Sequence, residues 1–121
     1  MIFFANSCAF MDKIKLVEQD WDYLVILDAC RYDFFHSMYA DFLEGSLEKK
    51  ISLGSCTDKW RDNNFHDFYE DIVYITANPQ ICRDTEVYGY RAGEHFADVH
   101  EVWSNYWDKD HGTVLPDVLT D

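Results

Sequence analysis

An uninterrupted apolar run, Tyr23-Leu24-Val25-Ile26-Leu27, stops abruptly at Asp28. A segment that is apolar on both of its faces is typical of a central strand in a parallel sheet, because helices cover both sides of such a sheet. Parallel strands cannot be joined by tight hairpins, so each crossover needs a longer connection, usually a helix. The run therefore predicts that helical patterns alternate with further strands along the chain.

The rest of the sequence has this alternation. Apolar residues recur at helical spacing before and after the run, and short β-rich segments follow. The patterns predict helices over 10–21, 32–43 and 57–70, strands over 23–27, 50–53, 71–76 and 99–103, a loop over 80–91, helical turns over 92–97 and the start of another helix at Thr113 and Pro116. We therefore expect an α/β fold with a mostly parallel sheet of about four strands and helices on both faces. Residues 1–121 are expected to form a single α/β domain.

The net charge of −13 argues against nucleic acid as a partner, because the phosphate backbone repels an acidic surface. No apolar run approaches the roughly 20 residues that span a bilayer, and no basic residue precedes the short apolar opening of the chain. These features predict a cytoplasmic protein that does not enter a membrane. The four cysteines, Cys8, Cys30, Cys56 and Cys82, form no C-x-x-C pair, so we expect free thiols, most of them buried.

Candidate functional residues are those that directly follow the predicted strands, because ligands of parallel α/β sheets bind at the carboxyl ends of the strands. Asp28 is the sharpest of them. A carboxylate that ends an apolar strand is costly to bury unless it meets a cation or several hydrogen-bond donors. Its side chain is thus a metal ligand or a catalytic group, or it caps the following helix.

Ser55, Cys56 and Thr57 offer three hydroxyl or thiol groups at the start of a predicted helix. The free N–H groups of a helix N-terminus favour an anion such as phosphate or sulfate. One alternative is that Ser55 or Thr57 caps the helix while Cys56 is packed.

Two of these segments resemble sulfatase-like proteins of the alkaline phosphatase superfamily. Leu24 to Asp33 reads apolar strand, then Asp-x-x-Arg-x-Asp, as the first strand and loop of that family do. Ser52-Leu53-Gly54-Ser55-Cys56-Thr57 is similar to the segment that carries the family's nucleophile, and Asn78-Pro79 resembles a group of archaeal sulfatase-like proteins. The resemblance covers residues 20–121, which correspond to the first part of a family member.

The resemblance implies a role for each matching residue. Asp28 would bind a divalent metal such as zinc, manganese, magnesium or calcium, and Thr57 would attack a phosphate or sulfate ester. Ser55 and Cys56 are alternative nucleophiles, but the Cys-x-Pro-x-Arg pattern of formylglycine sulfatases does not follow Cys56. Arg31 would contact the anionic substrate or pair with Asp33. Asn78 would donate to a substrate oxygen or form a turn before Pro79.

The family's remaining metal ligands come from a later part of its fold. Asp110-His111-Gly112 is similar to their motif, but no apolar strand precedes it; roles for His95, His100 and His111 stay open. We therefore expect the N-terminal part of a larger hydrolase, holding metal weakly and nearly inactive by itself, which a C-terminal half or a partner subunit completes. The alternative is a degenerate binding or assembly module that uses the aromatic side chains from Trp103 to Trp107.

Overall fold

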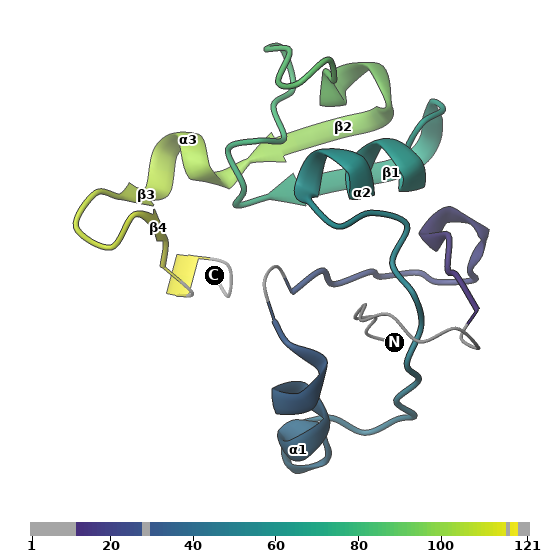
Figure 1. Ribbon diagram of the computed structural model, residues 1–121. Coiled ribbons are helices and arrows are strands. Elements are labelled where there is room, and N and C mark those ends of the chain that lie inside the picture. The colour runs from purple at the N-terminus through teal and green to yellow at the C-terminus, as the bar shows by residue number, and fades with distance from the viewer. Residues whose placement is uncertain (1–11, 28–29, 116, 119–121) are drawn as a thin grey trace. The chain divides into compact units, whose positions relative to one another are not determined.

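A computed structural model describes residues 12–27, 30–115 and 117–118, and Figure 1 shows it as a ribbon. The chain divides into two compact units, Met1–Asn64 and Phe65–Asp121. The first contains a 3-10 turn, η1 (Leu16–Glu18), and the helices α1 (Tyr32–Phe42) and α2 (Thr57–Asn64). The second contains β1 (Tyr69–Thr76), η2 (Ala92–Glu94), β2 (Phe96–Glu101), α3 (Val102–Tyr106), β3 (Trp107–Asp108) and β4 (Thr113–Val114). The described chain is thus mixed α/β, as predicted.

Helix α1 confirms the helix predicted over 32–43. Its first internal hydrogen bond runs from the Phe35 N–H to the Arg31 carbonyl (3.1 Å), and its last from the Leu43 N–H to the Tyr39 carbonyl (2.8 Å). Phe35 is buried and its ring stacks on Tyr39 one turn later, with centroids 5.9 Å apart. Packing of this i, i+4 aromatic pair stabilises the helix. The exposed positions of α1 carry both polar and apolar side chains.

The helix predicted over 10–21 is wrong within the described residues, where only the 3-10 turn η1 forms. The reason lies in the backbone hydrogen bonds. The Ile14 N–H donates to the Ile51 carbonyl (3.2 Å), and the Ile51 N–H donates to the Asp12 carbonyl (3.1 Å). A parallel bridge between Lys13 and Ile51 therefore uses backbone groups that a helix would need for itself.

The strand predicted over 23–27 does not form either, because these residues lie outside any helix or strand of the described chain. A strand requires a neighbour that accepts and donates ladder hydrogen bonds. The predicted strand over 50–53 contributes only the bridge of Ile51, and that bridge goes to Lys13 instead. Tyr23 and Val25 are consequently 93% and 64% exposed.

The second unit is built around a parallel pair of strands, β1 and β2, which lie side by side in Figure 1. Tyr74 is paired with Val99, and Thr76 with Glu101. The predicted strand over 71–76 is confirmed; the one predicted over 99–103 lies at 96–101, because residue 102 begins α3.

Aromatic side chains from both strands form the core of this unit. The ring of Phe65, which is 1% exposed, meets Tyr69, Tyr74 and Phe96 edge-on, with centroids 6.1, 6.0 and 5.2 Å away. Tyr90 closes the cluster from the loop after β1, where its hydroxyl donates to the Phe65 carbonyl (3.0 Å). Edge-to-face packing of this kind adds about 0.5–1.5 kcal/mol per pair to the stability from area burial. The core therefore explains why α2 ends at Asn64 rather than continuing to residue 70.

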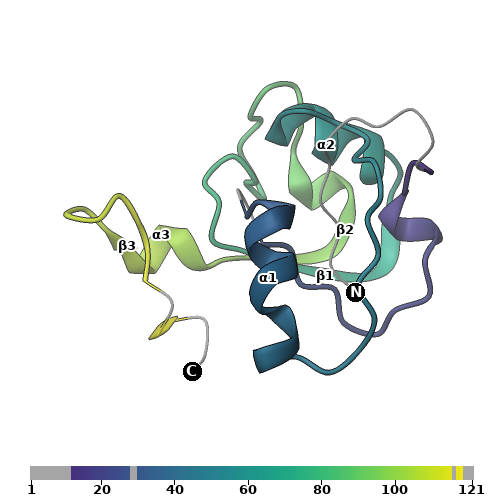
Figure 2. The same cartoon turned by 60° about the horizontal axis from the view of Figure 1, so that its bottom comes forward.

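Past β2 the chain forms α3 and the antiparallel hairpin β3–β4, which extend away from β1 and β2 in both Figure 1 and Figure 2. The hairpin corrects one expectation, since Thr113 was predicted to precede a helix and instead lies in β4. Pro116, the other residue of that prediction, lies outside the described residues.

Candidate functional site

The loop that leads into α2 is held against the helix. The Ser52 hydroxyl donates to the Gly54 carbonyl (2.9 Å) and accepts from the Gly54 N–H (3.3 Å), while the Asn63 amide donates to the Leu53 carbonyl (2.5 Å). At Gly54 a Cβ atom would lie 2.6 Å from the Trp60 Cα and from the Lys59 carbonyl carbon, with the Trp60 nitrogen nearer still. Only glycine permits this approach of loop to helix.

Residues 55–57 lie directly after this loop. Thr57 is the first residue of α2 and is half-buried, whereas Ser55 and Cys56 are exposed. The capping position belongs to Cys56, because its carbonyl accepts the first helical hydrogen bond, from the Trp60 N–H (2.9 Å). This corrects the alternative in which Ser55 or Thr57 caps the helix while Cys56 is packed.

The Cys56 thiol has an electrostatic partner. It donates a hydrogen bond to the Asp58 carboxylate, and this bond lowers the pKa of Asp58 below its usual value of 3.8.

Helix α2 is anchored by buried polar side chains. The Asn64 side chain, which is 0% exposed, accepts from the Leu16 N–H (3.0 Å) and donates to the Trp60 carbonyl (2.9 Å). Arg61 is 1% exposed, and its guanidinium pairs with the Asp62 carboxylate at 2.9 Å. Satisfied buried groups of this kind fix the helix, and with it the position of Thr57.

Arg31 is paired within its own turn. Its Nε and Nη2 donate to the two oxygens of Asp33 at 3.1 and 2.6 Å, and these hydrogen bonds lower the pKa of Asp33. Both side chains are mostly exposed, so the pair is open to solvent and contributes little to stability. Among described residues, no hydrogen bond or ion pair joins Arg31 to residues 55–57. The structure thus has the Asp33 pairing that the sequence offered as one of two roles.

Asn78 occupies a turn. Its N–H donates to the Thr76 hydroxyl (3.0 Å), its carbonyl accepts from that hydroxyl (3.1 Å), and its side-chain oxygen accepts from the Gln80 N–H (2.9 Å). Side-chain hydrogen bonds of asparagine to the backbone two residues on are typical of turns. The geometry therefore has the turn role that the sequence gave as the alternative to substrate binding.

The predicted metal ligand Asp28 lies outside the described residues. Within 12–27, 30–115 and 117–118, no three His, Cys, Asp or Glu side chains come together to hold an ion. The Asp110-His111-Gly112 motif lies in the turn of the β3–β4 hairpin, where Asp108 accepts from the His111 N–H and ring (both 2.9 Å). The motif therefore has a structural role in this turn. The same hydrogen bonds lower the pKa of Asp108.

The sequence left the roles of His95 and His100 open, and both side chains have contacts within the second unit. The His95 ring stacks on Tyr90 at 4.1 Å, and the His100 Nε2 lies 3.2 Å from Asp98. Cys82 is buried, and burial together with the charge of Glu101 raises the pKa of its thiol. Cys8 lies outside the described residues, and of the others only Cys82 is buried, which corrects the expectation that most are.

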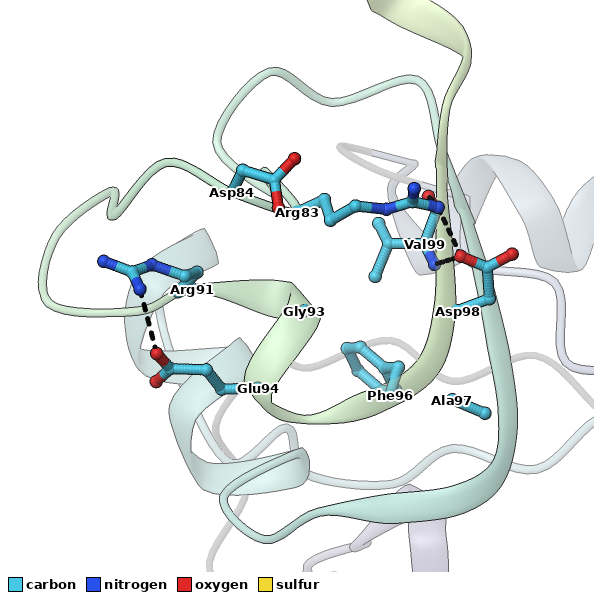
Figure 3. Close-up of a pocket in the computed structure, with 9 residues that line it drawn as sticks. All are labelled: Arg83, Asp84, Arg91, Gly93, Glu94, Phe96, Ala97, Asp98 and Val99. Atoms are coloured by element: carbon cyan, nitrogen blue, oxygen red, sulfur yellow. Dashed lines mark hydrogen bonds and ion pairs between the residues drawn. The ribbon is translucent and has the colours of Figure 1, made fainter.

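A pocket of about 420 Å³ in the second unit was not predicted. Figure 3 shows its lining, which combines charged and apolar residues: Arg83, Asp84, Arg91, Gly93, Glu94, Phe96, Ala97, Asp98 and Val99. Five of these are ionisable and come from a segment that the sequence marked only as loop, turn and strand. The available signal was the charge density of the long loop over 80–91, because such loops commonly carry function.

Comparisons of the chain with protein-family models, with curated proteins and with solved structures give no match. No helix within the described ranges combines the length and the apolar character that crossing a membrane requires.

Proposed function

We propose that the chain is the N-terminal part of a metal-dependent hydrolase of phosphate or sulfate esters, with an alkaline-phosphatase-like sheet of about four strands, acting in the cytoplasm. The observation that carries the proposal is the placement of Thr57. Thr57 is the first residue of α2, and the backbone N–H groups of a helix's first turn have no partner within the helix. The loop before it is fixed by Ser52, Gly54 and Asn63, which favours a defined position for a nucleophile.

In the proposed reaction the Thr57 oxygen forms a bond to the phosphorus or sulfur atom as the bond to the ester oxygen breaks. The alcohol leaves with one proton, and the Thr57 hydroxyl gives one up to solvent. Water then cleaves the enzyme ester and restores that hydroxyl. The helix N-terminus favours the negative charge of the transferred group.

Asp28 is proposed as one ligand of a divalent metal: zinc, manganese, magnesium or calcium. A catalytic ion needs three or more protein ligands, so the others would come from a C-terminal half or a partner subunit. An ion bound there would offset charge on the ester oxygens. Arg31 and Asn78 would reach the substrate only by giving up their contacts with Asp33 and with the turn after Thr76.

The test is hydrolysis of p-nitrophenyl phosphate and p-nitrophenyl sulfate by the natural gene product, with manganese or zinc present. Thr57→Ala is expected to lower kcat by at least about a thousandfold, as loss of a nucleophile does, whereas Asn105→Ala, an exposed position far along the chain, leaves kcat unchanged. Undiminished turnover by Thr57→Ala contradicts the assignment, and a loss confined to Cys56→Ser or Ser55→Ala moves the role to that residue.

A second candidate is a binding or assembly module without catalysis. One observation favours it: the outer side chains of β1, Val73 and Ile75, are 55% and 66% exposed, and Tyr106 and Trp107 beyond β2 are 57% and 40% exposed. Parallel strands are normally covered on both faces, so apolar side chains left open there suit a protein interface. An absence of turnover with every metal, joined to stable capture of a partner subunit, favours this candidate over the hydrolase.

A further inference from the structure

We propose that the pocket of the second unit binds a small organic cation, a primary amine carried on an apolar or aromatic body. This site is built entirely from residues 83–99 and is separate from the hydroxyl and thiol groups of residues 55–57. Its volume of about 420 Å³ is at the lower end of the range for small-molecule sites, ~300–1,000 Å³.

Charge balance in the pocket selects the sign of the ligand. The Arg83 guanidinium donates to the Asp98 carboxylate and to the Val99 carbonyl, the latter at 2.5 Å. The Arg91 guanidinium pairs with Glu94 at 3.1 Å. Both positive charges are thus matched, and Figure 3 shows the two pairs on separate sides of the pocket.

Asp84 carries the charge that is left. Its side chain is exposed, and it makes no hydrogen bond or ion pair with any residue in the described part of the chain. With both arginines neutralised, this carboxylate gives the pocket a net negative charge, and the chain's overall −13 adds a field of the same sign. Such a pocket attracts cations and repels carboxylate or phosphate ligands.

The floor favours an apolar body on that cation. Phe96 and Val99, which are 3% and 2% exposed, close the base of the pocket, and the exposed Ala97 adds apolar surface beside them. Gly93 keeps one wall close, since a Cβ there would lie 2.7 Å from the Arg83 carbonyl oxygen. A ring or short hydrocarbon on the floor would let an ammonium group reach Asp84 at the rim.

Three compounds of similar size and with the same phenyl body test the sign of the ligand's charge: phenethylamine, 2-phenylethanol and phenylacetate. They are titrated into the full chain to about 10 mM, and backbone amide shifts are followed by NMR. We expect millimolar binding of the amine, with the largest shifts at Asp84, Arg91 and Ala97, and weaker binding at high salt because the contact is exposed. The alcohol should bind more weakly and phenylacetate not at all.

Two variants test the residue. Asp84→Asn should weaken the amine about threefold to tenfold, the loss expected for one charged hydrogen bond near solvent, while Asp110→Asn, the same charge change in the exposed hairpin turn, should leave the affinity unchanged. Asp84→Lys should exchange the preference, so that phenylacetate binds better than the amine. The proposal is overturned by equal binding of all three compounds, by shifts outside residues 83–99, by the absence of any shift, or by Asp84→Asn behaving as Asp110→Asn does.

Discussion

Gly54→Ala is the sharpest perturbation of the loop that positions Thr57. Gly54 is not one of the glycines with a positive φ, so alanine is compatible with its backbone conformation. Replacement of such a glycine normally stabilises a protein by about 0.4–1 kcal/mol, because the unfolded chain loses conformational freedom. The sign of the effect therefore depends on the space around the new methyl group.

That space is absent. The new Cβ would lie 2.6 Å from the Lys59 carbonyl carbon and from the Trp60 Cα, and these backbone atoms cannot rotate away as a side chain can. Ordinary carbon contacts are about 3.5–4.0 Å, so loop and helix must separate by roughly 1 Å. Overpacking of this kind costs about 1–3 kcal/mol, which exceeds the entropic gain. We expect Gly54→Ala to lower the free energy of unfolding by about 1–2 kcal/mol.

Urea unfolding followed by far-UV circular dichroism measures this change, and amide hydrogen exchange of α2 locates it. The matched control is Ser55→Ala at the next position, where the exposed side chain should change stability by less than about 0.5 kcal/mol. A neutral or stabilised Gly54→Ala protein, with unchanged exchange in α2, would refute the close packing of loop and helix.

Three further outcomes follow from single contacts. Phe65→Ala should destabilise the protein by about 3–5 kcal/mol because it empties the centre of the aromatic core; a loss under about 1 kcal/mol by urea unfolding contradicts this. Thr76→Val should cost about 1 kcal/mol by removing the hydroxyl that bonds the backbone of Asn78, whereas a change of zero means the turn does not need it. His111→Ala should raise the lowered pKa of Asp108 toward 3.8 but not fully, because the backbone hydrogen bond remains. The stabilisation that Asp108 gives is fully present above its usual pKa and is lost as pH falls through its folded pKa. In the variant this stabilisation should therefore be smaller, and its loss should be complete at a higher pH; an unchanged carboxyl titration by NMR disproves the ring contact.

Local sequence signals predicted those elements whose own residues determine them. Helix α1 forms because Phe35 and Tyr39 stack within it, and β1 forms over a β-branched and aromatic run that is broken by Asn78-Pro79. The turn at Asn78 follows from the side chain's reach to its own backbone. These contacts are short in sequence, so periodicity and turn chemistry suffice to predict them.

Elements that depend on distant partners were mispredicted. The apolar pattern over 10–21 suits a helix, but the Ile51 backbone hydrogen-bonds to this segment instead, and no local pattern encodes that choice. Residues 23–27 have the composition of a central strand and still need a neighbour to become one. The pocket was not predicted for the same reason. Its residues Arg83 and Asp98 are distant in sequence and come together only where the loop over 80–91 meets β2.

The central claim, a hydrolase centre that uses Asp28 and Thr57, is tested most directly by calorimetric titration of zinc and manganese into the natural gene product together with any partner subunit that completes the site. The account predicts micromolar to weaker binding that is abolished by Asp28→Asn and retained by Asp41→Asn, an exposed carboxylate on α1. Binding that is identical in both variants, or no heat of binding with either metal, would contradict it.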